Sequence, residues 1–120
     1  KWYRLAAEQG RAAAQCGLGF MYCKGFGVPQ DYEESAKWYR LSAEQGFAKA
    51  QDNLGMMYAR GEGVSQDFIQ AYAWCSIAAA NESADAVNNR DIAANKLTPE
   101  QLAEGQALAK QYFEKYQPKP

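Results

Sequence analysis

The hydrophobic pattern follows a helical period along the whole chain. Between residues 12 and 23, Ala14, Leu18 and Tyr22 stand four positions apart, which places them on one face of a helix. Similar stripes run through the later segments, and no segment shows the alternation with a period of two that marks a strand. The pattern therefore predicts no sheet, and it predicts helices over residues 1–9, 12–23, 32–45, 48–60, 68–80, 84–95 and 99–116.

Capping and turn-forming residues mark the ends of these predicted helices. Gly10 and Gly46 stand where a helix ends and a left-handed residue is needed, whereas Asp31 and Asp67 precede helices as N-caps. Residues 98–101, Thr-Pro-Glu-Gln, combine an N-cap threonine, a proline at the first helical position and a glutamine three positions after the cap. These helix ends thus have a local chemical cause.

The chain repeats itself with a period of 36 residues. A shift of 36 positions superposes Trp2, Trp38 and Trp74, and it matches 21 of the 31 residues in 1–31 onto 37–67. Self-similarity of this length is typical of a solenoid, in which each unit buries its apolar face against its neighbours. Within one domain we expect the second helix of an incomplete unit (1–10), two full units (11–46 and 47–82), a degenerate capping pair (83–117) and a tail (118–120).

Each full unit carries the motif Ala-x-x-x-Leu-Gly-x-x-Tyr-x-x-Gly-x-Gly-Val-x-x-Asp, followed by a helix that contains tryptophan. On this motif the sequence resembles the Sel-one-like repeat (SLR) family, which is related to tetratricopeptide repeats. The resemblance covers residues 1–80, and the helix that begins at 98–101 resembles the C-terminal cap of bacterial members. The first copy comprises Ala14, Leu18, Gly19, Tyr22, Gly25, Gly27, Val28, Asp31, Trp38, Tyr39, Ala43 and Gly46; the second comprises Ala50, Leu54, Gly55, Tyr58, Gly61, Gly63, Val64, Asp67, Trp74 and Ala79.

This resemblance implies an all-α, right-handed superhelix of antiparallel helix pairs whose first helices line a concave groove. It also implies an adaptor or scaffold function, with a protein or peptide as the partner. Bacterial members are often linked to the envelope, secretion or host contact, and eukaryotic members to membrane-protein quality control. One cysteine-rich branch is linked to penicillin binding or lactam hydrolysis. Its paired cysteines would fall near Ala43 and Gln51 here, and because neither residue is a cysteine, we do not transfer that activity.

Composition and charge limit the kinds of partner and site that we expect. The 13 basic and 14 acidic residues give a net charge of −1 without a long run of one sign, which argues against a nucleic-acid partner. No apolar run approaches the roughly 20 residues that span a bilayer, so we expect no membrane insertion. The chain has no histidine, and its three cysteines, Cys16, Cys23 and Cys75, are expected to be reduced. We therefore assign no catalytic residue, metal ligand or cofactor site.

A candidate binding surface lies on the first-helix positions that the Leu-Gly-x-x-Tyr packing motif does not use. Phe20, Met56 and Ile92 would form an apolar stripe across three successive helices, with cationic residues beside it. Such a stripe suits an extended or helical peptide, and its cations suit one with acidic residues. The alternative is that superhelix curvature buries the stripe as core. The full candidate set is Cys16, Phe20, Cys23, Lys24, Asp52, Met56, Arg60, Asn88, Ile92 and Lys96.

The sequence thus favours a non-enzymatic protein-interaction module. Two alternatives stay open, an enzyme acting on a cell-wall or lactam substrate and a structural spacer within a longer solenoid. Because Lys1 lies inside a repeat motif, we expect the sequence to be part of a longer protein, and the cellular compartment is not fixed. We also expect Trp2, Tyr3 and Leu5 to be partly exposed and available for self-association with a second copy.

Overall fold

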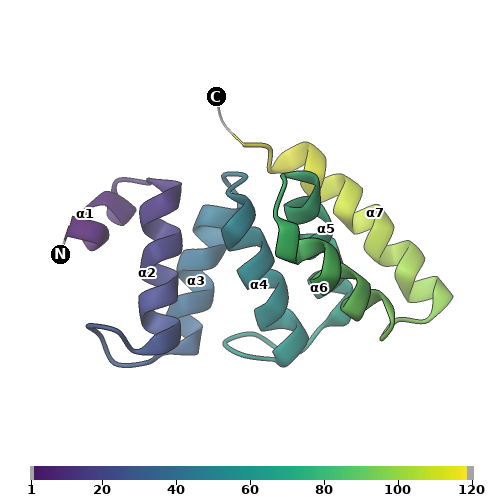
Figure 1. The fold of residues 1–120 in the computed structure, drawn as a ribbon, viewed down its shortest axis with the longest axis horizontal. Coiled ribbons are helices and arrows are strands. Elements are labelled where there is room, and N and C mark those ends of the chain that lie inside the picture. Colours follow the sequence, from purple (N-terminus) through teal and green to yellow (C-terminus); the bar gives the residue numbers. More distant parts are fainter. Residues whose placement is uncertain (1, 119–120) are drawn as a thin grey trace.

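The computed structural model describes residues 2–118, which fold entirely as helices connected by short loops (Figure 1). The predicted helix bounds differ from the observed ones by at most two residues. Lys1 and residues 119–120, which the sequence analysis assigned to a helix and to the tail, lie outside the described residues. The helices are α1 (Trp2–Glu8), α2 (Ala12–Lys24), α3 (Tyr32–Ala43), α4 (Ala48–Arg60), α5 (Phe68–Ala80), α6 (Ala84–Ala94) and α7 (Pro99–Lys115).

The helices form an elongated solenoid. Helices α1 to α6 pack mainly against their neighbours in the sequence, whereas α7 packs against α5. Figure 1 shows these pairs following one another along the long axis of a molecule that measures 45 × 32 × 20 Å. The all-α solenoid expected from the repeat is therefore confirmed.

Local chemistry explains where the helices begin and end. Asp31 accepts a hydrogen bond from the backbone N–H of Glu34 at 3.1 Å, and Asp67 caps α5 in the same way. Thr98 and Gln101 form the expected capping box at the start of α7. The loops after α2 and α4 each contain two glycines with positive φ, and a Cβ at Gly63 would lie 2.2 Å from the carbonyl oxygen of Tyr32. The backbone conformation of these loops therefore requires glycine.

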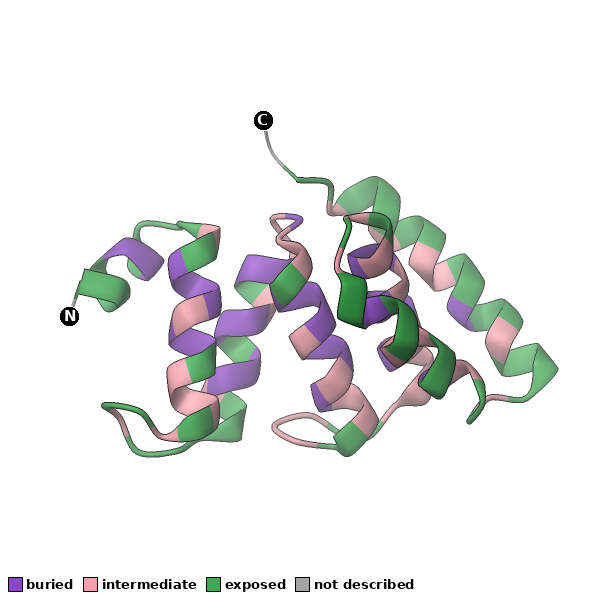
Figure 2. Cartoon of the chain, viewed as in Figure 1, coloured by how far each residue is buried: buried purple, intermediate pink, exposed green. Residues whose placement is uncertain are grey.

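The two helices of each unit approach closely because glycine replaces a side chain between them. A Cβ added at Gly19 would lie only 2.8 Å from the ring of Tyr39. A Cβ added at Gly55, the equivalent position in the next unit, would lie 2.6 Å from the Cys75 sulfur. Purple segments in Figure 2 show that the buried residues lie along these contacts. Burial extends to Trp74, which is 0 % exposed.

Buried glutamines link one unit to the next. The side-chain amide of Gln51 donates to the carbonyl oxygen of Ala43 at 3.0 Å, and its own oxygen accepts a hydrogen bond from Asn81 at 3.1 Å. Gln15 makes the same two kinds of bond one unit earlier, to Ala7 and with Gln45. These bonds satisfy polar groups that would otherwise be costly to bury, so they fix the stacking of successive units.

The last helix covers the end of the solenoid. Trp74 of α5 stacks on Tyr116, with ring centroids 5.5 Å apart and planes 15° from parallel, and it also contacts Tyr112. The Tyr112 hydroxyl donates to the side-chain oxygen of Gln70 at 2.9 Å. Helix α7 thus shields the tryptophan of the second full unit from water.

Candidate binding hollow

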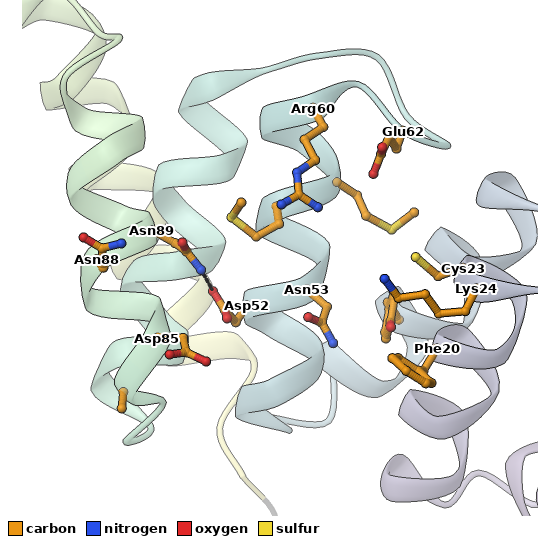
Figure 3. A pocket seen from close by; sticks show the side chains of 14 residues that line it. Phe20, Cys23, Lys24, Asp52, Asn53, Arg60, Glu62, Asp85, Asn88 and Asn89 are labelled. Carbon is orange, nitrogen blue, oxygen red and sulfur yellow. Dashed lines mark hydrogen bonds between the residues drawn. The ribbon is translucent and has the colours of Figure 1, made fainter.

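An open hollow of about 430 Å³ lies between α2, α4 and α6 (Figure 3). All three are the first helices of their pairs, so residues separated by one or two repeats in the sequence meet around it. We call this space the α2–α4–α6 hollow. It is lined by Phe20, Cys23, Lys24, Tyr39, Asp52, Asn53, Met56, Met57, Arg60, Glu62, Ala84, Asp85, Asn88 and Asn89.

Seven of the ten residues singled out from the sequence line this hollow, and three do not. Cys16 was expected on the same face but is 5 % exposed, because it packs in the core cluster that buried residues of α3 and α4 form. Ile92 and Lys96 are exposed, but they lie one and two turns beyond Asn88, past the α6 residues that line the hollow.

The apolar stripe is not part of the core. Phe20 is 44 % exposed, Ile92 is 47 % exposed, and Met56 is only partly buried. The alternative that superhelix curvature buries all three side chains is therefore wrong. The ring of Phe20 also meets that of Phe26, from the loop after α2, edge to face at 5.8 Å. Phe26 extends the exposed apolar surface, and no spacing rule within a helix could have indicated it.

The charge around the hollow is mixed. Lys24 and Arg60 are exposed, and neither forms an ion pair within residues 2–118. However, Glu62 and Asp85 line the same hollow (Figure 3). Of the cations expected beside the stripe, Lys24 and Arg60 line the hollow, and acidic residues from the loop after α4 and the first turn of α6 join them.

Asp52 lies on the α4 side of the hollow and is 8 % exposed. Its Oδ1 accepts a hydrogen bond from the side-chain amide of Asn89 at 2.9 Å, drawn as a dashed line in Figure 3, and one from the Cys75 thiol at 3.7 Å. Burial, and secondly the negative charge of Asp52, raise the pKa of Cys75 above its ordinary value. The thiol therefore stays protonated and serves as a donor.

Several lining residues were missed in the sequence analysis, although one signal was available. Asn53 and Asn89 stand 36 positions apart and both line the hollow, so the repeat itself places amides on this face. Asp85 has no such signal, because Lys49 occupies the equivalent position one unit earlier. Its position became evident only once α6 was placed against α4.

Tyr39 contributes its ring to the hollow, and burial followed by the nearby Cys16 and Cys23 raises its pKa, so the hydroxyl stays protonated. No group of three or more His, Cys, Asp or Glu within residues 2–118 is placed to hold a metal ion. In the same described part of the chain, no helix combines the length and apolarity that crossing a membrane requires.

Comparisons with known proteins agree with this architecture. The Sel1 repeat family matches residues 1–10, 12–47 and 48–83. The structure of c5321 from uropathogenic Escherichia coli, described as a protective antigen displaying an SLR fold, superposes with a TM-score of 0.93. It is 43 % identical over 96 % of this chain, which spans 25 % of that protein.

A Sel1 repeat protein from Oxalobacter formigenes superposes with a TM-score of 0.73 and is 42 % identical, over 75 % of this chain and 68 % of that one. A comparison with curated proteins gives no match. Both structural relatives are bacterial, and their likeness extends from sequence to fold. Because three Sel1 repeat matches cover most of the chain and lie on the helix pairs described above, this protein belongs to the Sel1 repeat family.

Proposed function

We propose that this protein is a non-enzymatic interaction module that holds a polypeptide in the α2–α4–α6 hollow. One observation carries the proposal: Phe20 and Met56 are apolar and accessible, and they lie on helices whose buried residues belong to the core. Neither side chain is needed to join one unit to the next. An accessible apolar surface with a polar surround is typical of a protein-interaction site.

The shape and chemistry of the hollow suit a peptide. Its volume of about 430 Å³ is enough for several side chains, and it opens to solvent along three helices. The amides of Asn53, Asn88 and Asn89 can donate to and accept from a peptide backbone. The unpaired cations Lys24 and Arg60 add charged contacts at one end of the hollow. Together these groups offer apolar anchoring, backbone recognition and orientation.

The family context agrees with a binding function, since Sel1 repeat proteins typically act as scaffolds. A cell-wall or lactam-directed activity has less support. Cys16 and Cys75 are buried and have raised pKa values, which disfavours the thiolate that a cysteine nucleophile needs. No histidine stands beside any cysteine to act as a base, because the chain contains none.

The proposal can be tested with a library of displayed random peptides selected on the immobilised protein. Enriched peptides should lose at least about tenfold in affinity for the Met56→Glu variant, because a charged side chain would replace the apolar anchor of the hollow. Leu41→Glu is the matched control, since Leu41 is a half-exposed apolar residue of α3 that does not line the hollow. Both variants should melt close to the parent temperature.

Two results would contradict the proposal. One is the absence of any enriched peptide, and the other is an equal loss of affinity in Met56→Glu and Leu41→Glu. If Met56→Glu proves unstable, the double variant Lys24→Glu/Arg60→Glu replaces it, because both side chains are exposed and form no ion pair within the described residues. That variant should also weaken the binding of the selected peptides.

A further inference from the structure

Asp52 is a buried carboxylate without a cation. It is 8 % exposed, and no Lys or Arg within residues 2–118 pairs with it. Buried carboxylates are ordinarily paired with a cation or fully hydrogen-bonded, because removing the charge from water is costly. An incompletely compensated carboxylate in a lined hollow is therefore a place where a ligand can supply the missing charge.

The hydrogen bonds of Asp52 leave one of its oxygens free. Both donors, the Asn89 amide and the Cys75 thiol, bond to Oδ1, and no donor among residues 2–118 bonds to Oδ2. The two bonds hold the carboxylate in one orientation against α5 and α6. A fixed acceptor of this kind binds an incoming donor without a large loss of side-chain entropy.

The surroundings of Asp52 favour a positively charged ligand group. Asp52 and Asp85 line the α2–α4–α6 hollow together, and both also line an adjoining hollow of about 360 Å³ that includes Glu82. Lys49 lies at the edge of that second hollow but forms no ion pair with any of the three. Three carboxylates therefore line the adjoining hollow, and Lys49, the cation that lines it with them, forms no ion pair within residues 2–118.

On the basis of the function proposed above, we propose that Asp52 anchors a basic side chain of the bound polypeptide, an arginine or a lysine. The guanidinium or ammonium group donates to Oδ2 of Asp52, and Asp85 adds a second, more solvent-exposed contact. A guanidinium fits best, because its fork of donors can reach two carboxylates at once. The bound peptide then places its basic residue beside α6 and its apolar residue on Phe20 and Met56.

The test uses three displayed peptide libraries whose central residue is fixed as Arg, Leu or Glu and whose other positions are random. The parent protein should enrich binders mainly from the Arg library. A synthetic copy of an enriched peptide is then compared with a copy in which citrulline, which is uncharged and nearly isosteric, replaces the arginine. Fluorescence anisotropy should show about tenfold weaker binding of the citrulline peptide.

The variant Asp52→Asn identifies the partner of that arginine. It keeps the Oδ1 acceptor for Asn89 but replaces the charged Oδ2 acceptor by an uncharged amide, so we expect it to weaken the Arg peptide about tenfold and the citrulline peptide much less. Lys49→Gln is the opposite control, since removing the neighbouring cation should leave or raise the affinity for the Arg peptide. If Asp52→Asn unfolds, Asp85→Asn, on the exposed first turn of α6, should still weaken the binding of the Arg peptide.

The outcomes separate this inference from the proposed function. Peptides that lose affinity in Met56→Glu but bind Asp52→Asn and Asp85→Asn as they bind the parent would overturn the basic-residue site alone. Enrichment from the Leu or Glu library in preference to the Arg library would do the same. Failure to obtain any peptide whose binding depends on Met56 would overturn both proposals.

Discussion

The three cysteines show how far one residue type depends on its surroundings. Cys16 and Cys75 are buried between helices, whereas Cys23 is partly exposed at the hollow. Burial, partly offset by Lys49, raises the pKa of Cys16 from 9.0 to about 11, and the pKa of Cys75 is also raised. The folded state therefore holds these two protons more tightly than the unfolded chain does.

This difference predicts a loss of stability in alkaline solution. A group whose pKa is higher in the folded state contributes stability below its unfolded pKa and loses it as the pH rises through the folded value. Between pH 9 and pH 11, Cys16 should account for a decrease of at most about 2 to 3 kcal/mol in the free energy of unfolding. Urea unfolding under reducing conditions measures this decrease.

The variant Cys16→Ala provides the comparison for that measurement. Its absolute stability falls because a buried sulfur is lost, so the quantity to compare is the slope of stability against pH. We expect a shallower slope than in the parent. An unfolding free energy that stays constant in the parent from pH 9 to pH 11 would contradict the burial of these thiols.

Sequence reasoning succeeds at single residues where the cause is local. The caps at Asp31, Asp67 and Thr98 were predictable because each bonds to a backbone N–H within three positions. The burial of Cys16 was not, because it depends on how closely α3 approaches α2. That Asp52 keeps one oxygen without a donor was also not predictable, because the donors to its other oxygen come from α5 and α6, 23 and 37 positions away.

At the scale of helices, glycine determines how closely the two members of a pair approach. A Cβ at Gly55 would lie 2.6 Å from the Cys75 sulfur and 3.2 Å from the carbonyl oxygen of Ala71 on the facing helix. A Cβ at Gly17 would meet only the ring of Tyr3, whose side chain is nearly half exposed. The same substitution should therefore have different effects at the two positions.

We predict that Gly55→Ala destabilises the protein. Overpacking costs about 1 to 3 kcal/mol, which exceeds the gain of about 1 kcal/mol that alanine has over glycine within a helix. Gly17→Ala should be neutral or slightly stabilising, because the Tyr3 ring can move away. Thermal unfolding of both variants and of the parent measures these two changes in stability. Equal stability of Gly55→Ala and the parent would show that α4 and α5 are not packed as closely as described.

Helix bounds were predictable to within two residues because glycines follow the first four helices and capping side chains precede α3, α5 and α7. The hollow was predictable on α2 and α4, where the repeat motif shows which face is used in packing. On α6 that motif is lost, with Arg90 and Asp91 in place of Leu54 and Gly55. The part of α6 that lines the hollow therefore ends at Asn89, before Ile92, and includes Asp85.

At the scale of the whole molecule, the repeat predicts that its three tryptophans have equivalent surroundings, but those of the first differ. Trp38 and Trp74 are 8 % and 0 % exposed, whereas Trp2 is 69 % exposed together with its neighbour Leu5. An apolar face of this kind is covered by a first helix in the other two units. Exposed aromatic and aliphatic side chains on one helix favour association with a complementary surface.

We therefore predict that this chain associates with a second copy through α1 at high concentration. Sedimentation velocity over a range of concentrations should show a reversible dimer, and the double variant Trp2→Gln/Leu5→Gln should shift it toward the monomer. The substitutions should change the melting temperature little, because both side chains are already exposed. A parent protein that stays strictly monomeric at the highest concentration would contradict the prediction.

We propose that the faces of α2, α4 and α6 around the hollow bind a polypeptide. Titration of the isotope-labelled protein with a library-selected peptide, followed by the NMR shifts of its backbone amides, tests this proposal. The largest shifts should fall on residues around Phe20, Met56 and Asn88, with little change on α3 and α7. Shifts concentrated on α3 or α7, with those three regions unchanged, would contradict it.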